Sequence, residues 1–148
     1  MKKLILKLKE GLFTLLKSQI LIEMKLEREL FLYMFFGVLT TLVNIAVYLF
    51  FTRLLGVNYL ISNILAWTLS VLFAYVTNRI WVFESRNNDI LKEMALFFAG
   101  RIFSGVVDTG LMWLLIDVLF VGDAISKIIV QVIVVVLNYV LSKAVVFK

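Results

Sequence analysis

The chain has 148 residues, of which 63% are hydrophobic and only 17% are charged, with a net charge of +5. Soluble domains carry roughly 25% charged residues, so an ordinary water-soluble fold is excluded and one compact membrane domain is expected. The absence of cysteine and histidine excludes disulfides, thiolate nucleophiles, Cys/His metal sites and imidazole proton transfer, and no cofactor or enzymatic activity is expected.

Residues 1–29 are predicted to form an amphipathic helix that lies at the membrane surface. Lys7, Lys9 and Glu10 interrupt any apolar stretch, so a cleaved signal peptide is not expected. A helix that docks a partner protein is the alternative interpretation. We therefore divide the chain into a helix over 1–29 and a transmembrane domain over 30–148. The apolar residues that recur at helical spacing in the first segment are Leu4, Leu8, Leu12, Leu15 and Leu16.

Four apolar runs follow, each long enough to cross a bilayer at 1.5 Å per residue. They lie at about Leu30–Leu55, Tyr59–Thr77, Met94–Val121 and Ala124–Leu141. Short links that contain Gly56 and Gly122 join them into two helical hairpins. A longer polar connection is expected between the hairpins, from Asn78 to Glu93. The predicted fold class is all-α, a polytopic membrane protein with four transmembrane helices and an additional N-terminal amphipathic helix.

Lysine and arginine residues gather at three places: the N-terminal segment, the central connection and the C-terminal tail. Since positively charged loops resist translocation, we expect both termini and the central connection on the cytoplasmic side of the cytoplasmic membrane. The same placement explains the positive charge without a nucleic-acid partner. The basic residues that set this orientation are Lys2, Lys3, Lys7, Lys9, Lys17, Lys25, Arg28, Arg79, Arg86, Lys92, Lys143 and Lys148.

The second hairpin repeats the first after 64 residues, because Phe147 follows Phe83 by that interval and the same shift matches other positions without gaps. Ungapped register with matched polar positions indicates an internal duplication. Each repeat holds an even number of spans, so we expect two parallel halves related by an axis along the membrane normal. The pairs that match include Val43 with Val107, Ile61 with Ile125, Ser62 with Ser126, Tyr75 with Tyr139, Asn44 with Asp108 and Arg79 with Lys143.

Ionisable side chains inside the predicted spans cost about 2.5–3.5 kcal/mol each on insertion scales, so each calls for a partner, a cavity or a function. Arg101 and Asp108 are seven residues apart and lie on one face of the third span. In one interpretation, Arg101 pairs with a carboxylate or extends to the membrane interface. In the other, Arg101 binds an anion, and Lys127 provides a second cationic binding site. The fourth span adds a polar face formed by Lys127, Gln131, Asn138 and Ser142.

The string Asn78-Arg79-Ile80-Trp81-Val82-Phe83 closes the second span, and Ser142-Lys143-Ala144-Val145-Val146-Phe147 repeats it at the end of the fourth. Together with Phe36-Gly37-Val38, the number of spans and the loop pattern, these motifs resemble the GtrA-like family over about residues 30–148. The resemblance implies a membrane protein of cell-surface polysaccharide biosynthesis that moves polyprenyl-phosphate-linked monosaccharides or supports a lipid-dependent glycosyltransferase. Ser142, Lys143 and Val145 depart from the motif in the second copy.

The motif has two interpretations. Either Arg79 holds the phosphate while Trp81 and Phe83 sit among head groups or stack on a sugar ring, or these residues form an ordinary aromatic and basic anchor belt. The substrate-binding residues that we predict are Asn78, Arg79, Trp81, Phe83, Arg101, Asp108, Lys127, Gln131, Asn138 and Lys143.

Three functions follow in order of preference. The first is a flippase that translocates polyprenyl-phosphate-linked monosaccharides, contacts membrane lipids and forms a homo-oligomer to widen its groove. The second is a non-transporting partner that presents lipid-linked sugar to a membrane glycosyltransferase. The third is a cation-coupled exporter that uses Asp108 as its membrane carboxylate.

Overall fold

The structure is a computed structural model that describes residues 2–147, apart from the side chains of Tyr59, Leu60, Asp123, Ala124 and Lys127. The described residues form four α-helices, and each of these helices ends in a five-residue π-helical turn. The described residues contain no strand, which confirms the predicted all-α class. The elements in chain order are α1 (Lys2–Leu49), η1 (Phe50–Leu54), α2 (Tyr59–Thr77), η2 (Asn78–Val82), α3 (Ile90–Trp113), η3 (Leu114–Val118), α4 (Asp123–Leu141) and η4 (Ser142–Val146).

The connection between the hairpins is shorter than predicted. The second span was expected to end at Thr77, but η2 continues the helix to Val82 and α3 already begins at Ile90. The helix passes through Arg79 because that side chain has a carboxylate partner on α3 and does not need to reach water. At the other end, the Asp89 side chain caps α3 by accepting a hydrogen bond of 3.2 Å from the Lys92 backbone nitrogen.

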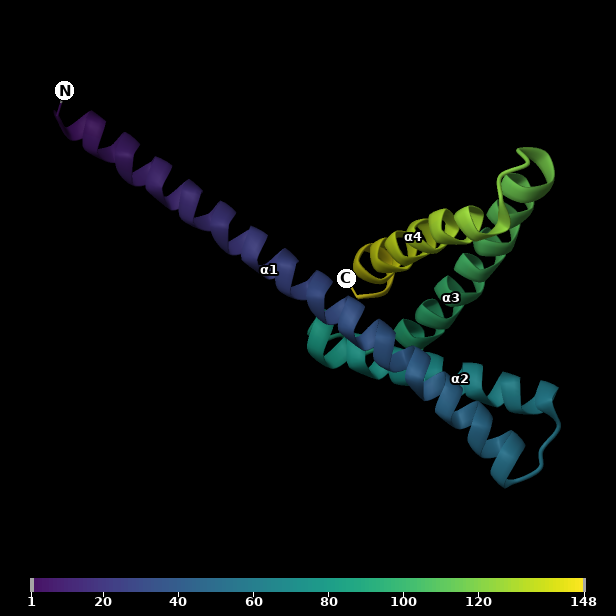
Figure 1. The fold of residues 1–148 in the computed structure, drawn as a ribbon. Coiled ribbons are helices and arrows are strands. Elements are labelled where there is room, and N and C mark those ends of the chain that lie inside the picture. The colour runs from purple at the N-terminus through teal and green to yellow at the C-terminus, as the bar shows by residue number, and fades with distance from the viewer. Residues whose placement is uncertain (1, 148) are drawn as a thin grey trace.

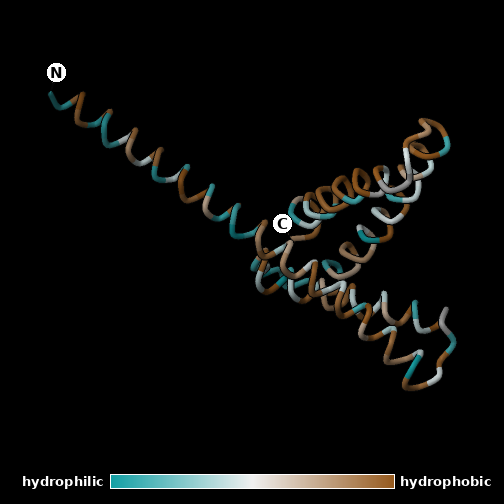
Figure 2. Tube along the Cα trace, viewed as in Figure 1, coloured by the Kyte–Doolittle hydropathy of each residue, from teal (hydrophilic) through white to brown (hydrophobic). Residues whose placement is uncertain are grey.

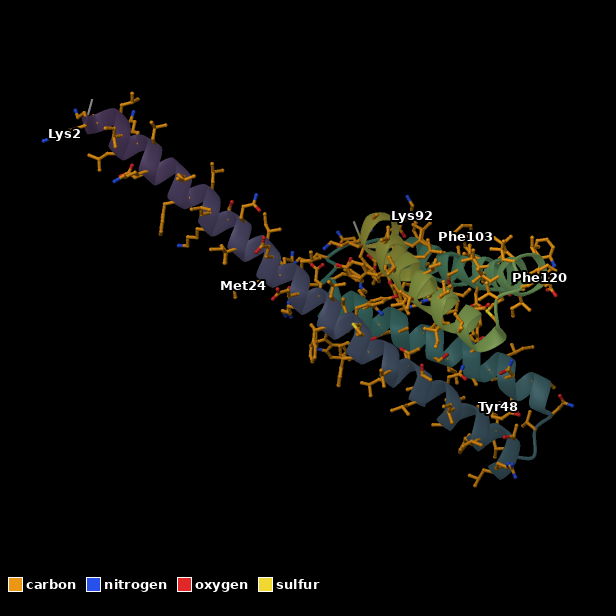
Figure 3. The ribbon with its side chains drawn as sticks, turned by 45° about the horizontal axis from the view of Figure 1, so that its top comes forward. Lys2, Met24, Tyr48, Lys92, Phe103 and Phe120 are labelled. Carbon is orange, nitrogen blue, oxygen red and sulfur yellow. The ribbon has the colours of Figure 1, made fainter. Side chains whose placement is uncertain are left out.

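The N-terminal segment is helical, as predicted, but no break separates it from the first span. Figure 1 shows α1 as one straight rod whose N-terminal half projects away from the other helices. Its side chains from Lys2 to Arg28 are exposed, and those near Lys2 and Met24 in Figure 3 have no other element beside them. Polar and apolar residues alternate along this half in Figure 2. Its place at a membrane surface remains a prediction.

The two hairpins, α1 with α2 and α3 with α4, converge near the C-terminus and spread apart toward their tips (Figure 1). Their boundaries repeat after the interval seen in the sequence. A shift of 64 residues carries η1 onto η3, α2 onto α4 and η2 onto η4, residue for residue at both ends. The hairpin turns match too: Gly56 has a φ of 64° and its counterpart Phe120 has a φ of 54°. The duplication predicted from the sequence is therefore present in the backbone.

Three helical segments are long and apolar enough to cross a membrane by length and composition: Lys2–Leu54, Ile61–Val82 and Ile128–Val146. Most large apolar side chains on them are exposed, which suits a chain whose surroundings are lipid. The 24-residue helix α3 carries Arg101 and Asp108 along its length. That α3 is the fourth span stays a prediction.

The buried apolar core lies where the hairpins converge. Its members come from α2, α3, η4 and the residue that follows η4, and they are Val71, Ala74, Tyr75, Phe97, Val146 and Phe147.

Candidate functional site

Two ion pairs join the repeats where they converge. The Arg79 guanidinium of the first repeat pairs with the Glu93 carboxylate of the second. In the opposite direction, Lys143 Nζ of the second repeat lies 2.5 Å from Glu29 Oε2 of the first. Glu29 and Glu93 are themselves 64 residues apart, as are Arg79 and Lys143. Each repeat therefore supplies one acid and one base, and the partners are exchanged across a pseudo-twofold axis.

A tyrosine hydroxyl completes each pair. Tyr75 donates a hydrogen bond of 3.0 Å to Glu93, and its counterpart Tyr139 donates one of 3.4 Å to Glu29. The Ser85 hydroxyl also donates to Glu93, at 2.5 Å. Charges that are taken out of water need several such partners, and these hydroxyls supply them.

An aromatic cluster lies beside the ion pairs and follows the same symmetry. Phe83 and Phe147, which are counterparts, stack on each other with ring centroids 5.1 Å apart. Tyr139 contacts Tyr33 at 5.4 Å, as Tyr75 contacts Phe97 at 5.7 Å. The two repeats thus meet through equivalent rings.

The two ion pairs differ in exposure. In the first pair, the Arg79 side chain is 17% exposed and that of Glu93 is fully buried. In the second, Lys143 is 43% exposed and Glu29 is 6% exposed. The Arg79–Glu93 pair is therefore the more strongly buried junction, and the Lys143–Glu29 pair is the one that water or a ligand reaches.

A groove of about 390 Å³ begins directly beside the Lys143–Glu29 pair, since Tyr33 and Asn138 belong to its wall and flank Tyr139. The wall comes mainly from α1 and α4, with η2 and α3 at the back. The residues that line the groove are Tyr33, Met34, Gly37, Val38, Thr40, Thr41, Asn78, Arg101, Gln131, Val135 and Asn138.

Arg101 provides the groove with its positive charge. The guanidinium carbon lies 4.9 Å from the centroid of the Phe97 ring, and the guanidinium interacts with the Tyr33 hydroxyl. Among the described residues, the ion pairs within 4.0 Å join other partners, and Arg101 takes part in none of them. A half-buried arginine with aromatic neighbours and no carboxylate is free to bind an anion.

The groove also presents hydrogen-bond acceptors and amides. Asn78 is 2% exposed; its Nδ2 donates to the Ala74 carbonyl at 2.6 Å, while its Oδ1 has no hydrogen-bond partner. Thr40 and Thr41 donate their hydroxyl protons to carbonyls one turn back, so they face the groove as acceptors. Asn138 and Gln131 add amide groups from α4. A buried acceptor without a partner is costly, and a bound hydroxyl would satisfy it.

The model of the GtrA/DPMS transmembrane domain matches residues 32–147. The chain belongs to this family. Three relatives have similar sequences. The uncharacterized membrane protein YwcD of Bacillus subtilis (strain 168) is 40% identical over 79% of this chain and 94% of that protein. The cell wall teichoic acid glycosylation proteins GtcA of Listeria monocytogenes and Listeria innocua are 42% and 41% identical, and each match covers 79% of this chain and 83% of the relative. No solved structure matches the chain.

The structure of this GtrA-like chain brings four of the predicted site residues together. Asn78, Arg101, Gln131 and Asn138 come from η2, α3 and α4, and all of them line the groove. These residues come together because η2 of the first repeat and α3 and α4 of the second repeat border the same groove. Whether they bind a substrate stays a prediction.

The other predicted site residues lie elsewhere. Arg79 and Lys143 are engaged in the exchanged ion pairs, and Phe83 belongs to the aromatic cluster. Trp81 is 48% exposed and stacks on Phe36 at 5.5 Å on the outer surface, as an interfacial anchor does. Asp108 is half-buried, makes a polar contact and does not line the groove. The Lys127 side chain lies outside the described residues.

The sequence reasoning missed Glu29 and Glu93, which hold the GtrA-like repeats together. A signal for them was present, because the shift of 64 residues superposes one on the other and each precedes a matched basic residue by 50 positions. Glu29 lies at the boundary set for the amphipathic segment, where a charged residue looks like part of a solvated face. In the structure it is 4% exposed and belongs to the helical bundle.

Proposed function

We propose that this chain takes part in the glycosylation of a cell-surface polymer by moving polyprenyl-phosphate-linked monosaccharides across the cytoplasmic membrane, without catalysing a reaction itself. The observation that carries the proposal is Arg101, a cation in an apolar helix that lines a groove and has no carboxylate partner in the described part of the chain. The relatives named for cell wall teichoic acid glycosylation support the part of the proposal that concerns glycosylation.

The chemistry of the groove suits a sugar phosphate. Arg101 offers charged donors to a phosphate, while Asn78 Oδ1 and the threonine oxygens accept hydrogen bonds from sugar hydroxyls. A volume of about 390 Å³ falls in the range of small-molecule sites, which is roughly 300–1,000 Å³. The polyprenyl tail remains in lipid beside α1 and α4, so that only the polar head needs a path.

The proposed orientation places both termini and the connection between the hairpins in the cytoplasm, because the lysine and arginine residues gather there. The exchanged ion pairs then lie at the cytoplasmic ends of the helices, and the groove extends from them into the membrane. A phosphate arriving from the cytoplasm meets Lys143 first, since that side chain is the exposed partner of its pair, and then Arg101.

Reconstituted protein tests the proposal. Liposomes that contain the purified chain and a fluorescent polyprenyl-phosphate sugar should transfer the head group between leaflets faster than empty liposomes. Arg101→Gln should slow transfer about tenfold or more, which corresponds to one lost charge-assisted hydrogen bond. Arg53→Gln is the matched control, because Arg53 lies in η1 at the hairpin tip and is exposed. Full-speed transfer by Arg101→Gln would remove Arg101 from the mechanism.

One observation favours a second function, a partner that presents lipid-linked sugar to a membrane glycosyltransferase. The N-terminal half of α1 is exposed on all sides, so its leucine stripe is available for a protein as well as for a lipid surface. Deletion of residues 2–24 distinguishes the two functions and keeps the Glu29 ion pair. Under the partner model, the deletion abolishes both co-purification with the glycosyltransferase and sugar modification, and the full-length protein transfers no lipid in liposomes.

A further inference from the structure

The duplication predicts two grooves, one on each side of the pseudo-twofold axis. Each residue that lines the groove between α1 and α4 has a counterpart 64 residues away, which would line a matching groove between α3 and α2. The polar members change identity under this shift. Gln131 corresponds to Trp67, Asn138 to Ala74, Asn78 to Ser142 and Arg101 to Gly37.

The counterparts close the second side instead of lining a cavity. Ala74 and Val71, the counterparts of Asn138 and Val135, are 2% and 5% exposed and belong to the buried core. Phe97 replaces Tyr33 and packs in the same core. At its edge, Trp67 and Phe98 meet edge to face with ring centroids 6.0 Å apart. Aromatic rings thus occupy the volume that remains open on the side of α1 and α4.

The single cation follows from the position of Arg101 near the axis. Its counterpart Gly37 lines the same groove, so both positions face one shared space. A Cβ atom at Gly37 would meet no atom within 4 Å, so the space beside this position is open. A second arginine there would place two like charges together in a membrane interior, where each is already costly. Divergence of the repeats provides one cation and the space around it.

We infer that only the side of α1 and α4 takes the lipid-linked phosphate, that the matching side between α2 and α3 is closed by apolar residues, and that each chain therefore holds one ligand. This inference rests on the proposed function. The ligand then reaches the site laterally from the bilayer beside α1 and α4, because residues of these two helices form most of the groove wall.

Photolabelling measures the number and place of the ligands. Full-length protein in nanodiscs is exposed to a photoreactive polyprenyl monophosphate, and the labelled peptides and label per chain are quantified. We expect one label per chain on the open side and none on the closed side. The residues expected to be labelled are Met34 and Val135, and their unlabelled counterparts are Phe98 and Val71, which lie against and in the buried core.

Gln131→Trp imports the residue that closes the other side and should reduce labelling about tenfold. Val132→Trp is the matched control, since Val132 is the next residue on α4, is 60% exposed and does not line the groove. Thermal unfolding of both variants reports whether they fold. Two competitors, phosphatidylglycerol in the nanodisc and added inorganic phosphate, test whether the site prefers the polyprenyl lipid to other phosphates. If either competitor, at the same concentration as the probe, prevents labelling, the assignment of a polyprenyl lipid is overturned.

Two labels per chain, or equal labelling of the two sides, would overturn the inference and leave the proposed function intact. Unlabelled wild-type protein that also transfers no lipid in liposomes would overturn the proposed function itself. One label that Gln131→Trp removes and Val132→Trp retains supports both.

Discussion

The exchanged ion pairs predict a large difference in stability between two equivalent substitutions, Glu93→Gln and Glu29→Gln. Glu93 is fully buried and accepts hydrogen bonds from Tyr75 and Ser85 in addition to its pair with Arg79. Removing one partner of a buried pair leaves the other charge uncompensated and costs about 3 kcal/mol, the lower limit of the usual range because glutamine keeps one acceptor oxygen.

Glu29 has the same place in the other repeat, but its partner Lys143 is 43% exposed and can turn to water. We expect Glu29→Gln to cost about 1 kcal/mol, as for a pair near the surface. The expected difference of about 2 kcal/mol is a factor of about 30 in the unfolding equilibrium.

Reversible unfolding in mixed micelles by added dodecyl sulfate measures these free energies through the fluorescence of Trp67, Trp81 and Trp113. Glu84→Gln is the control, because Glu84 and its partner Arg28 are both more than half exposed, and only a small loss of stability, below that of Glu29→Gln, is expected. The double variant Arg79→Leu/Glu93→Leu should lose less stability than the sum of its single variants. Equal losses for Glu93→Gln and Glu29→Gln would refute the assignment of Arg79–Glu93 as the more strongly buried junction.

Three further predictions concern other parts of the chain. Phe120 has a φ of 54° where its counterpart Gly56 has 64°, so Phe120→Gly should stabilise the protein by about 1 kcal/mol and Gly56→Ala should destabilise it. Thermal unfolding measures both changes, and stability changes of the same sign for the two variants would contradict the backbone argument. The Arg28 guanidinium, 2.5 Å from Glu84, holds the pKa of the Glu84 carboxyl below its usual range, so Arg28→Gln should raise this pKa in a carbon-detected NMR titration. The small stability that the pair adds should be present near neutral pH and lost as the pH falls through the lowered pKa. Asn78→Ala removes a buried acceptor that has no partner, so it should reduce binding of the sugar-bearing lipid about tenfold and leave the binding of sugar-free polyprenyl phosphate unchanged. Equal losses of binding for the two lipids would contradict the role given to Asn78 Oδ1.

The helices and the duplication could be predicted because both depend on patterns of residues that the sequence itself contains. Apolar runs of the length of a bilayer predict helices, and an ungapped shift of 64 residues predicts two equivalent hairpins. The helix ends could not be predicted as well. Arg79 looks like part of a polar loop that begins at Asn78, yet the helix continues through it because Glu93 is within reach on α3. Such a pairing depends on tertiary contacts between distant segments.

The candidate site was predicted in part for the same reason. Arg101, Gln131 and Asn138 stand out as polar residues in apolar helices, and the structure gathers them in one groove. Trp81 has the composition of a ligand-stacking residue, but the rotation of η2 turns it outward against Phe36. Sequence spacing gives the face of one helix, whereas the direction of that face depends on how the repeats meet.

The unbroken course of α1 has a mechanical consequence. Glu29 ties this helix to the second repeat, and the residues before it continue as a rigid arm of about 40 Å at 1.5 Å per residue. A tilt of the first hairpin by about 10° would displace the far end of the arm by about 7 Å, since the helix contains no hinge to absorb the rotation. Small changes in the angle between the hairpins are thereby converted into a large displacement far from the groove, where another molecule can detect it.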